Sequence, residues 1–359
     1  MLALTLIAFL IFVNGQAVTS GQQQTVTVPS PAAAPGSTGD VNTPATPKER
    51  MELGRRVNGL QGLDTGPWHL KASYEVFDTD GKSKDKGTFE EWWVGAKQYK
   101  LAFHSPQLSL EEYGTLHGIF RTGQRDWPAR PVGMIPRILI RPFPLEENPE
   151  KIKLKNYERN LGTLKLECTA YVGRDRSDLA ENTESYCFAS TNATLLYSTS
   201  PRHALQTLFE QVSLVHGHYV GRDIELFLLG KRWLSIHLEA LDALGPSALP
   251  DLSVPADAIP ASRRPDGPGV VSGGSNIKRV FSVYPELAKT RRVEGIVIIG
   301  ATIGVDGHIK NVEVLAGPPL LQKAATDAIQ QWVYQPCLID GEPVDVDIEV
   351  QVEYHLSGG

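Results

Sequence analysis

Long apolar runs are missing from this sequence. No stretch approaches the roughly 18 apolar residues that a helix needs to cross a bilayer. The longest apolar run, residues 2–13, is followed by Asn14-Gly15-Gln16-Ala17, which places small residues where a signal peptidase acts. We therefore expect residues 1–17 to be a signal peptide, cleaved before Val18, and the protein to be exported to the periplasm. An uncleaved membrane anchor is the alternative.

An excess of positive charge is also missing. The formal net charge is −6, and residues 281–359 hold five Lys and Arg residues against eleven Asp and Glu residues. A basic face for nucleic acid is therefore not indicated. The acidic C-terminal region favours a basic partner instead.

Cysteine is scarce, with three residues in the whole chain. Cys168 and Cys187 would close a loop of about 20 residues, which in an exported protein is worth about 3 kcal/mol of stability. We expect these two cysteines to form a disulfide. Cys337 is left over, and it fits a buried apolar role better than a reactive one because no His or Lys lies close to it in the sequence.

Catalytic signatures are absent as well. The sequence contains no Gly-x-Ser-x-Gly, His-Glu-x-x-His or Cys-x-x-Cys pattern and no Gly-rich phosphate loop. His216 and His218 would share one face of a strand, but two imidazoles without a third ligand are more often surface residues than a metal site. We therefore expect no enzyme, no cofactor and no metal site.

The chain is longer than one ordinary core, which rarely exceeds roughly 250 residues, so two domains are expected. Residues 18–50 are rich in Pro, Gln, Ser and Thr and are expected to form a disordered tether. Residues 245–277 are rich in Pro and Gly without regular periodicity and are expected to form a linker. These segments leave a middle domain, residues 51–244, and a C-terminal domain, residues 278–359.

Apolar and polar residues alternate in the middle domain, as in Trp68, Leu70 and Ala72 against His69 and Lys71. This period of two predicts an antiparallel, β-rich domain. The expected strands are residues 68–76, 87–94, 98–103, 118–122, 161–172, 185–198, 219–228 and 232–238. Residues 201–213 are expected to form a short helix or another strand.

The C-terminal domain is predicted to be α+β. Pro285 suits the first turn of a helix over residues 285–292, and Asp306-Gly307 is a hairpin signal between strands at residues 295–303 and 309–315. Apolar residues at helical spacing predict a second helix over residues 318–331. A last strand is expected at residues 344–354, where apolar residues alternate with acidic ones.

This order of elements, together with Tyr284-Pro285, Asp306-Gly307 and Tyr334-Gln335-Pro336, resembles the C-terminal domain of the TonB family. The resemblance implies a three-stranded antiparallel sheet under two helices, whose last strand pairs at its edge with the TonB box, an extended peptide of an outer-membrane receptor. The implied partner-binding residues are Val344, Val346, Ile348, Val350, Val352 and Tyr354. An internal strand, or one paired with a second copy in a homodimer, is the alternative.

Residues 87–103 faintly resemble the lipoprotein carriers LolA and LolB, through a Gly-Thr-Phe strand followed by a Lys-Gln-Tyr-Lys strand. That resemblance implies an incomplete barrel that holds acyl chains. The residues implied to line an apolar cavity are Trp92, Trp93, Tyr99 and Phe103. Aromatic residues on strands are, however, more often plain core.

Together these features predict a periplasmic, two-domain protein-interaction module that docks a peptide by strand addition, in transport across the outer membrane. A periplasmic carrier of lipid or lipoprotein is the alternative.

Overall fold

The computed structural model describes residues 46–356, apart from residues 61–65, 79, 96, 129, 144–152, 173–183, 191, 200–204 and 263–270. The expected signal peptide and most of the expected tether lie outside the described residues. The chain divides into two compact units, and each is described by itself. Unit 1 contains Met1–Asn58, Thr79–Gly81 and Lys153–Ser235, and unit 2 contains Gly59–Asp78, Lys82–Ile152 and Ile236–Gly359.

Unit 1 is built from antiparallel strands in the order β13-β10-β9-β8-β7-β6 and a β11-β12 hairpin. The strand bounds are β6 Leu154–Leu161, β7 Leu164–Tyr171, β8 Ser185–Ala189, β9 Leu195–Thr199, β10 Leu205–Glu210, β11 Ser213–Val215, β12 His218–Val220 and β13 Asp223–Leu228. The ambiguous segment at residues 201–213 therefore contains a strand, β10, among its described residues. Two of the longer predicted strands, residues 161–172 and 185–198, are each divided by a turn.

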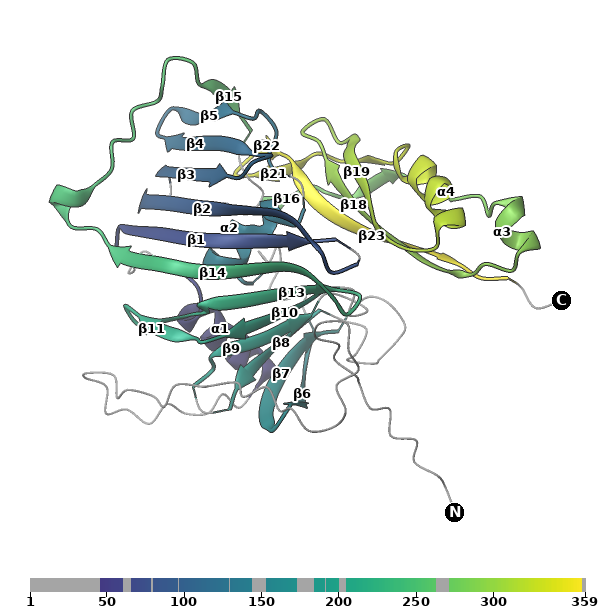
Figure 1. Cartoon of the computed structure of the whole chain (residues 1–359), viewed down its shortest axis with the longest axis horizontal. Helices are drawn as coiled ribbons and strands as arrows, with labels where there is room; N and C mark the ends of the chain where they lie inside the picture. Colours follow the sequence, from purple (N-terminus) through teal and green to yellow (C-terminus); the bar gives the residue numbers. More distant parts are fainter. Residues whose placement is uncertain are drawn as a thin grey trace. The chain divides into compact units, whose positions relative to one another are not determined.

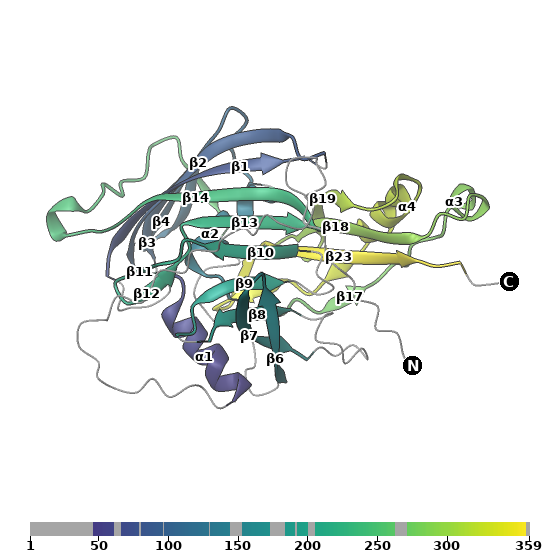
Figure 2. The ribbon, with the colours of Figure 1, turned by 60° about the horizontal axis from the view of Figure 1, so that its bottom comes forward.

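Helix α1, Pro47–Val57, overlaps the C-terminal end of the predicted tether, which therefore extended too far. The helix begins there because Thr46 and Glu49 form a capping box, in which each side chain accepts a hydrogen bond from the backbone N–H of the other residue. The side chain of Asn58 at the other end donates to Ala193 O at 2.8 Å and accepts from Leu195 N at 2.7 Å. Helix α1 is thus fixed against the strands of unit 1 (Figure 2).

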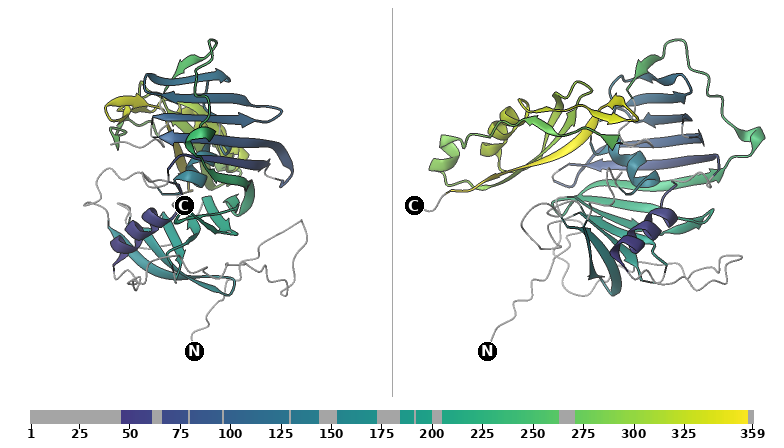
Figure 3. Two further views of the ribbon diagram at one scale, coloured as in Figure 1. Left: turned by 90° about the vertical axis from the view of Figure 1, so that its left-hand side faces the viewer. Right: turned by 180° about the vertical axis from the view of Figure 1, so that it is seen from behind.

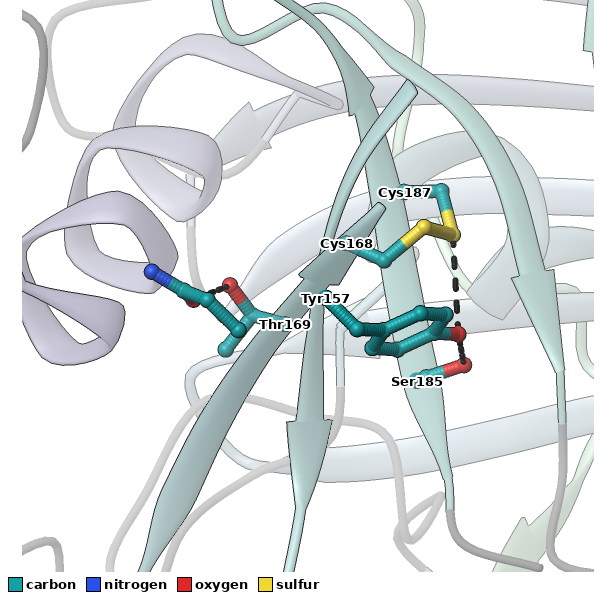
Figure 4. Close-up of a disulfide and its surroundings, with 6 residues drawn as sticks. Tyr157, Cys168, Thr169, Ser185 and Cys187 are labelled. Carbon is teal, nitrogen blue, oxygen red and sulfur yellow. Dashed lines mark hydrogen bonds between the residues drawn. A yellow bond between two sulfur atoms is a disulfide. The ribbon is translucent and has the colours of Figure 1, made fainter. Parts of the chain in front are cut away.

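Cys168 and Cys187 face each other across strands β7 and β8 and form a disulfide in the buried part of unit 1 (Figure 4). The hydroxyl oxygen of Tyr157, on β6, lies 2.8 Å from Ser185 Oγ and 3.8 Å from Cys187 Sγ. Three neighbouring strands therefore meet at this point. Cys337 is a buried residue of unit 2.

Unit 2 contains antiparallel strands in the order β15-β5-β4-β3-β2-β1-β14, which Figure 1 shows from β15 to β14. Their bounds are β1 Trp68–Phe77, β2 Ser83–Gly95, β3 Gln98–His104, β4 Ser109–Thr115, β5 Gly118–Gly123, β14 Lys231–Ala243 and β15 Ile259–Ala261, with the short helices η1 Val132–Met134, α2 Ile135–Ile140 and η5 Pro246–Ala248. Strand β14 contributes residues to both units. The β-rich prediction is confirmed, but β15 pairs with β5 inside a segment that was expected to be an irregular linker.

The remainder of unit 2 is the C-terminal module, which we define as residues 271–356. Its main sheet has the order β19-β18-β23, formed by Ile309–Ala316, Gly295–Ile303 and Val346–Tyr354. Helix α4, Pro319–Ile329, packs on β18 and β19 (Figure 3), and helix α3, Glu286–Thr290, packs against α4. The smaller pieces are β16 Val271–Ser272, β17 Asn276–Lys278, β20 Val333–Tyr334, β21 Cys337–Ile339 and β22 Glu342–Val344.

The expected linker therefore ends earlier than predicted, because β16 pairs with β21 and β17 pairs with β20. The predicted last strand is also divided. Val344 belongs to β22, and Asp345 turns aside to accept a hydrogen bond from Val305 N at 3.1 Å and to pair with Lys310 Nζ at 2.8 Å. Strand β23 begins at Val346.

Candidate functional site

Strand β23 lies at an edge of its sheet. Its pairing with β18 runs through nine consecutive residue pairs, from Gly295 opposite Tyr354 to Ile303 opposite Val346, without a register shift. Among the residues that the structure describes, no strand pairs with the outer side of β23. Such an edge is a regular template for another extended chain, because successive backbone amides and carbonyls repeat at the ladder spacing.

The opposite edge of the same sheet is irregular. The pairing of β19 with β18 shifts register between Ile298 and Ile299 and again between Gly300 and Thr302. Asn311 on β19 has φ of 51°, in the left-handed region. Bulges of this kind twist an edge away from further pairing. The two edges of one small sheet therefore differ, and β23 is the better template.

The helix-side face of β23 anchors the strand to the core of the module. Val350 and Tyr354 are buried in a cluster that contains Leu321 and Ile329 of α4, and Ile348 and Val352 pack against it. The Tyr354 hydroxyl lies against Ser282 Oγ, and burial raises the pKa of this phenol. The alternating apolar residues predicted for docking thus serve the core with their side chains. What β23 offers at the outer edge of the sheet is its backbone.

A cavity of about 270 Å³ opens beside the C-terminal half of β23. Its walls are the segment before α3, the end of α4 and the last residues of β23. The residues that line it include Arg279, Phe281, Ile329, Trp332, Val352 and Tyr354. The indole Nε1 of Trp332 donates to Val280 O at 2.7 Å, which holds the segment in place. The Arg279 guanidinium lies over the rings of Trp332 and Phe281, 5.1 and 5.5 Å from their centroids.

Sequence reasoning missed this cavity. Residues 280–283 lie far in sequence from β23, and only the folded module brings Phe281 to the rim, where it is 77% exposed. One signal in the sequence could have indicated it. Val280, Phe281 and Val283 form an apolar run just before a helix start, and this run belongs to no amphipathic helix or strand pattern.

The four aromatic residues predicted to line a cavity do not share one face. Trp93, Tyr99 and Phe103 lie on the buried face of the unit 2 strands, where Phe103 packs on Phe89 with ring centroids 4.9 Å apart. Trp92 points to the other face, where it stacks on His69 at 4.8 Å. The prediction that all four line one cavity is therefore wrong, since neighbours along a strand point to opposite faces.

The buried face of these strands also carries charge. Glu112 is fully buried and accepts a hydrogen bond from Tyr99 Oη at 2.8 Å and from Arg121 Nε at 2.7 Å. Arg121 further donates to the carbonyl oxygens of Arg125 and Ser262, at 3.1 and 3.3 Å. A buried ion pair, satisfied by hydrogen bonds, occupies the place where the sequence suggested an apolar lining.

His216 and His218 do not share a strand face either. His216 lies in the turn of the β11-β12 hairpin, with φ of 48°, whereas His218 begins β12 and is buried. Within the described ranges, no group of three or more His, Cys, Asp or Glu side chains is arranged to hold a metal ion.

Comparison with known proteins finds relatives of the C-terminal module. Residues 282–356 match the family described as Gram-negative bacterial TonB protein C-terminal, which confirms the resemblance stated for this part of the chain. The chain is similar to Protein TonB of Vibrio cholerae, with 30% identity over 95 residues, and to Protein TonB of Klebsiella pneumoniae, with 29% identity over 105 residues. These matches cover 26% and 29% of this chain, and 37% and 39% of those relatives.

Two solved structures are similar to a larger part of the chain. A LolA superfamily protein from Nitrosomonas europaea covers 57% of this chain and 98% of its own length, at 9% identity and a TM-score of 0.39. A lipoprotein-sorting protein domain from Vibrio parahaemolyticus covers 56% of this chain and 94% of its own length, at 7% identity and a TM-score of 0.37. TM-scores this low do not support an inference about the function of this chain.

Proposed function

We propose that the C-terminal module is a docking domain that binds an extended peptide of a protein partner by adding it to the outer edge of β23. By its similarity to TonB, the partner is a periplasmic segment of an outer-membrane TonB-dependent receptor, and the protein works in transport across the outer membrane. The module acts by binding and not by turnover.

The observation that carries this proposal is the contrast between the two edges of the sheet. Strand β23 offers nine residues in unbroken register, whereas β19 is interrupted twice. A peptide that pairs with β23 gains a continuous ladder of backbone hydrogen bonds, and affinity then depends little on its side chains. The core contacts of Val350 and Tyr354 hold the template rigid before the peptide arrives.

The periplasmic location is part of the proposal. It rests on the predicted signal peptide and on the similarity to TonB. Within the part of the chain that the structure describes, no helix has the length and apolar character that crossing a membrane requires.

Binding of synthetic TonB-box peptides to the full-length protein, followed by fluorescence anisotropy, tests this function. In an antiparallel strand, neighbouring amides point alternately inward and outward, so proline is placed in turn at Ile348 and at Glu349. One of these two residues has its amide pointing outward, and proline there removes a donor to the added peptide. We expect that substitution to abolish binding while the circular dichroism spectrum stays native. The matched control is Glu313→Pro, an exposed position on β19, which should leave binding intact.

Binding that survives both β23 prolines in folded protein would contradict strand addition at this edge. Failure of every receptor peptide to bind would remove the receptor from the proposal.

A further inference from the structure

Arg279, a cation at the cavity beside β23, has no acidic partner among the residues that the structure describes. We infer that the docked strand carries an Asp or Glu side chain that enters this cavity and pairs with the guanidinium of Arg279. This inference rests on the proposed strand addition, and it specifies one feature of the peptide, a carboxylate on the side that faces the helices.

Two aromatic rings hold the Arg279 side chain at the cavity. Its guanidinium carbon lies 5.1 Å from the ring centroid of Trp332 and 5.5 Å from that of Phe281. Trp332 is itself fixed, because its indole donates to Val280 O at 2.7 Å. The attraction between a cation and ring faces restricts the rotamers of a long side chain before any ligand arrives. The guanidinium is therefore preorganised.

The donors of Arg279 are available to a ligand. A guanidinium carries five N–H donors in a planar fork. Within the described part of the chain, the Arg279 side chain donates no hydrogen bond and forms no ion pair, and its contacts are those with the two rings. A carboxylate matches this fork with two parallel N–H···O bonds, whereas a Lys or Arg side chain of a peptide would be repelled. The chemistry of Arg279 therefore selects a carboxylate.

Glu353 and His355 also line the cavity. The Glu353 carboxylate lies 3.4 Å from His355 Nε2, so this acid has a partner on its own chain. Along β23, Glu353 lies between Val352 and Tyr354, whose side chains pack toward the helices, so its own side chain points to the open side of the sheet. Arg279 therefore sets the charge that a peptide side chain meets on the helix side.

The geometry of a sheet decides which peptide positions reach Arg279. Side chains of an added strand alternate between the two faces, and each lies beside the residue paired with it. Near the end of β23 the neighbours on the helix side are Val352 and Tyr354, and both line the cavity. The cavity, of about 270 Å³, is far larger than the roughly 10–15 Å³ that one water needs. The preference for a carboxylate should thus appear at one peptide position and not at its two neighbours.

A second copy of β23 cannot supply this carboxylate. The residues of that strand that face the helices are apolar or aromatic, and its acidic side chains alternate onto the open side: Asp347, Glu349 and Glu353. The acidic composition of residues 281–359 favours a basic partner for the module as a whole, but Arg279 precedes that range and lies at the cavity. Local charge therefore favours a heterologous peptide with one acidic residue at this place.

The test uses the full-length protein and the receptor peptide that binds most tightly, with its own acids replaced by their amides and both ends blocked. Glu or Gln is then placed at each position in turn. Affinity is measured by fluorescence anisotropy at about 0.15 M salt, where charges more than about 8 Å apart are largely screened. We expect Glu to bind about two- to fivefold better than Gln at one position and equally at its two neighbours.

Variants of the protein assign that preference. Arg279→Gln should remove the difference between the Glu and Gln peptides while the circular dichroism spectrum stays native. Arg279→Lys keeps the charge but not the fork, and should retain only part of the difference. The matched control is Arg291→Gln, an exposed arginine outside the cavity lining, which should retain all of it.

Equal affinity for Glu and Gln at every position, or a preference that survives Arg279→Gln, would overturn this inference and leave strand addition standing. Absence of binding by every peptide, the parent receptor peptides included, would overturn the proposed function and this inference with it.

Discussion

The indole Nε1 of Trp332 donates a hydrogen bond to the carbonyl oxygen of Val280 at 2.7 Å, across 52 residues of sequence. This contact joins the end of α4 to the segment that precedes α3, and so builds one wall of the cavity beside β23. The candidate site thus combines a backbone edge with a cavity that depends on one side-chain hydrogen bond.

Replacing Trp332 with Phe keeps a ring in the core but leaves the Val280 carbonyl without this donor. A net hydrogen bond is worth about 0.5–1.5 kcal/mol, and we expect a loss of stability of about that size. Hydrogen exchange of residues 279–284 should accelerate, while exchange in unit 1 should not change. Unaltered exchange in this segment would show that the bond does not hold it.

Gly307 in the β18-β19 hairpin has φ of 82°, and a Cβ there would lie 2.0 Å from the carbonyl oxygen of Tyr334. Gly341 has φ of 84° but no atom within 4 Å of its Cβ position. Both Ala variants lose about 1–2 kcal/mol for the left-handed conformation. Gly307→Ala should lose more in urea unfolding because of the clash, and equal losses would contradict this explanation.

The hairpin and the last strand could be predicted from the sequence because their signals are local. Asp306-Gly307 fixes a turn, and alternation fixes which residues of β23 face the core. Strands β15 and β17 could not be predicted, because each is only three residues long and so shows no periodicity. Each forms by pairing with a strand that is distant in sequence, through residues such as Arg121 and Tyr334. The capping pair of helix α1, Thr46 and Glu49, is also a local signal in the sequence, although the composition of residues 18–50 favours a tether. The sequence also indicates that Trp92 and Trp93 point to opposite faces, because they are neighbours along one strand.

The buried pair of Glu112 and Arg121 should matter more for stability than an exposed pair. Removing one partner of a buried ion pair costs about 3–5 kcal/mol, because the other charge stays buried. We expect Glu112→Gln to approach that loss in chemical unfolding. Asp327→Asn breaks the exposed i,i+4 pair with Lys323 and should cost less than about 0.5 kcal/mol. Similar small losses would show that the buried carboxylate is not needed.

The disulfide of unit 1 joins residues 19 positions apart, and a loop of this size is worth about 3 kcal/mol. The double variant Cys168→Ala, Cys187→Ala should unfold at a lower urea concentration by about that free energy. Peptide binding by the C-terminal module, which lies in unit 2, should persist at the same affinity. Cys337→Ala, which leaves the disulfide intact, serves as the control. A loss of peptide binding in the double variant but not in this control would contradict the independence of the docking site from the disulfide.

Hydrogen exchange of the full-length protein, with and without saturating receptor peptide, tests strand addition most directly. If the peptide adds to β23, the outward amides of residues 346–354 become protected, while those of β19, residues 309–316, exchange as before. Protection confined to β19, or to segments outside the C-terminal module, would contradict the assignment of β23 as the docking edge.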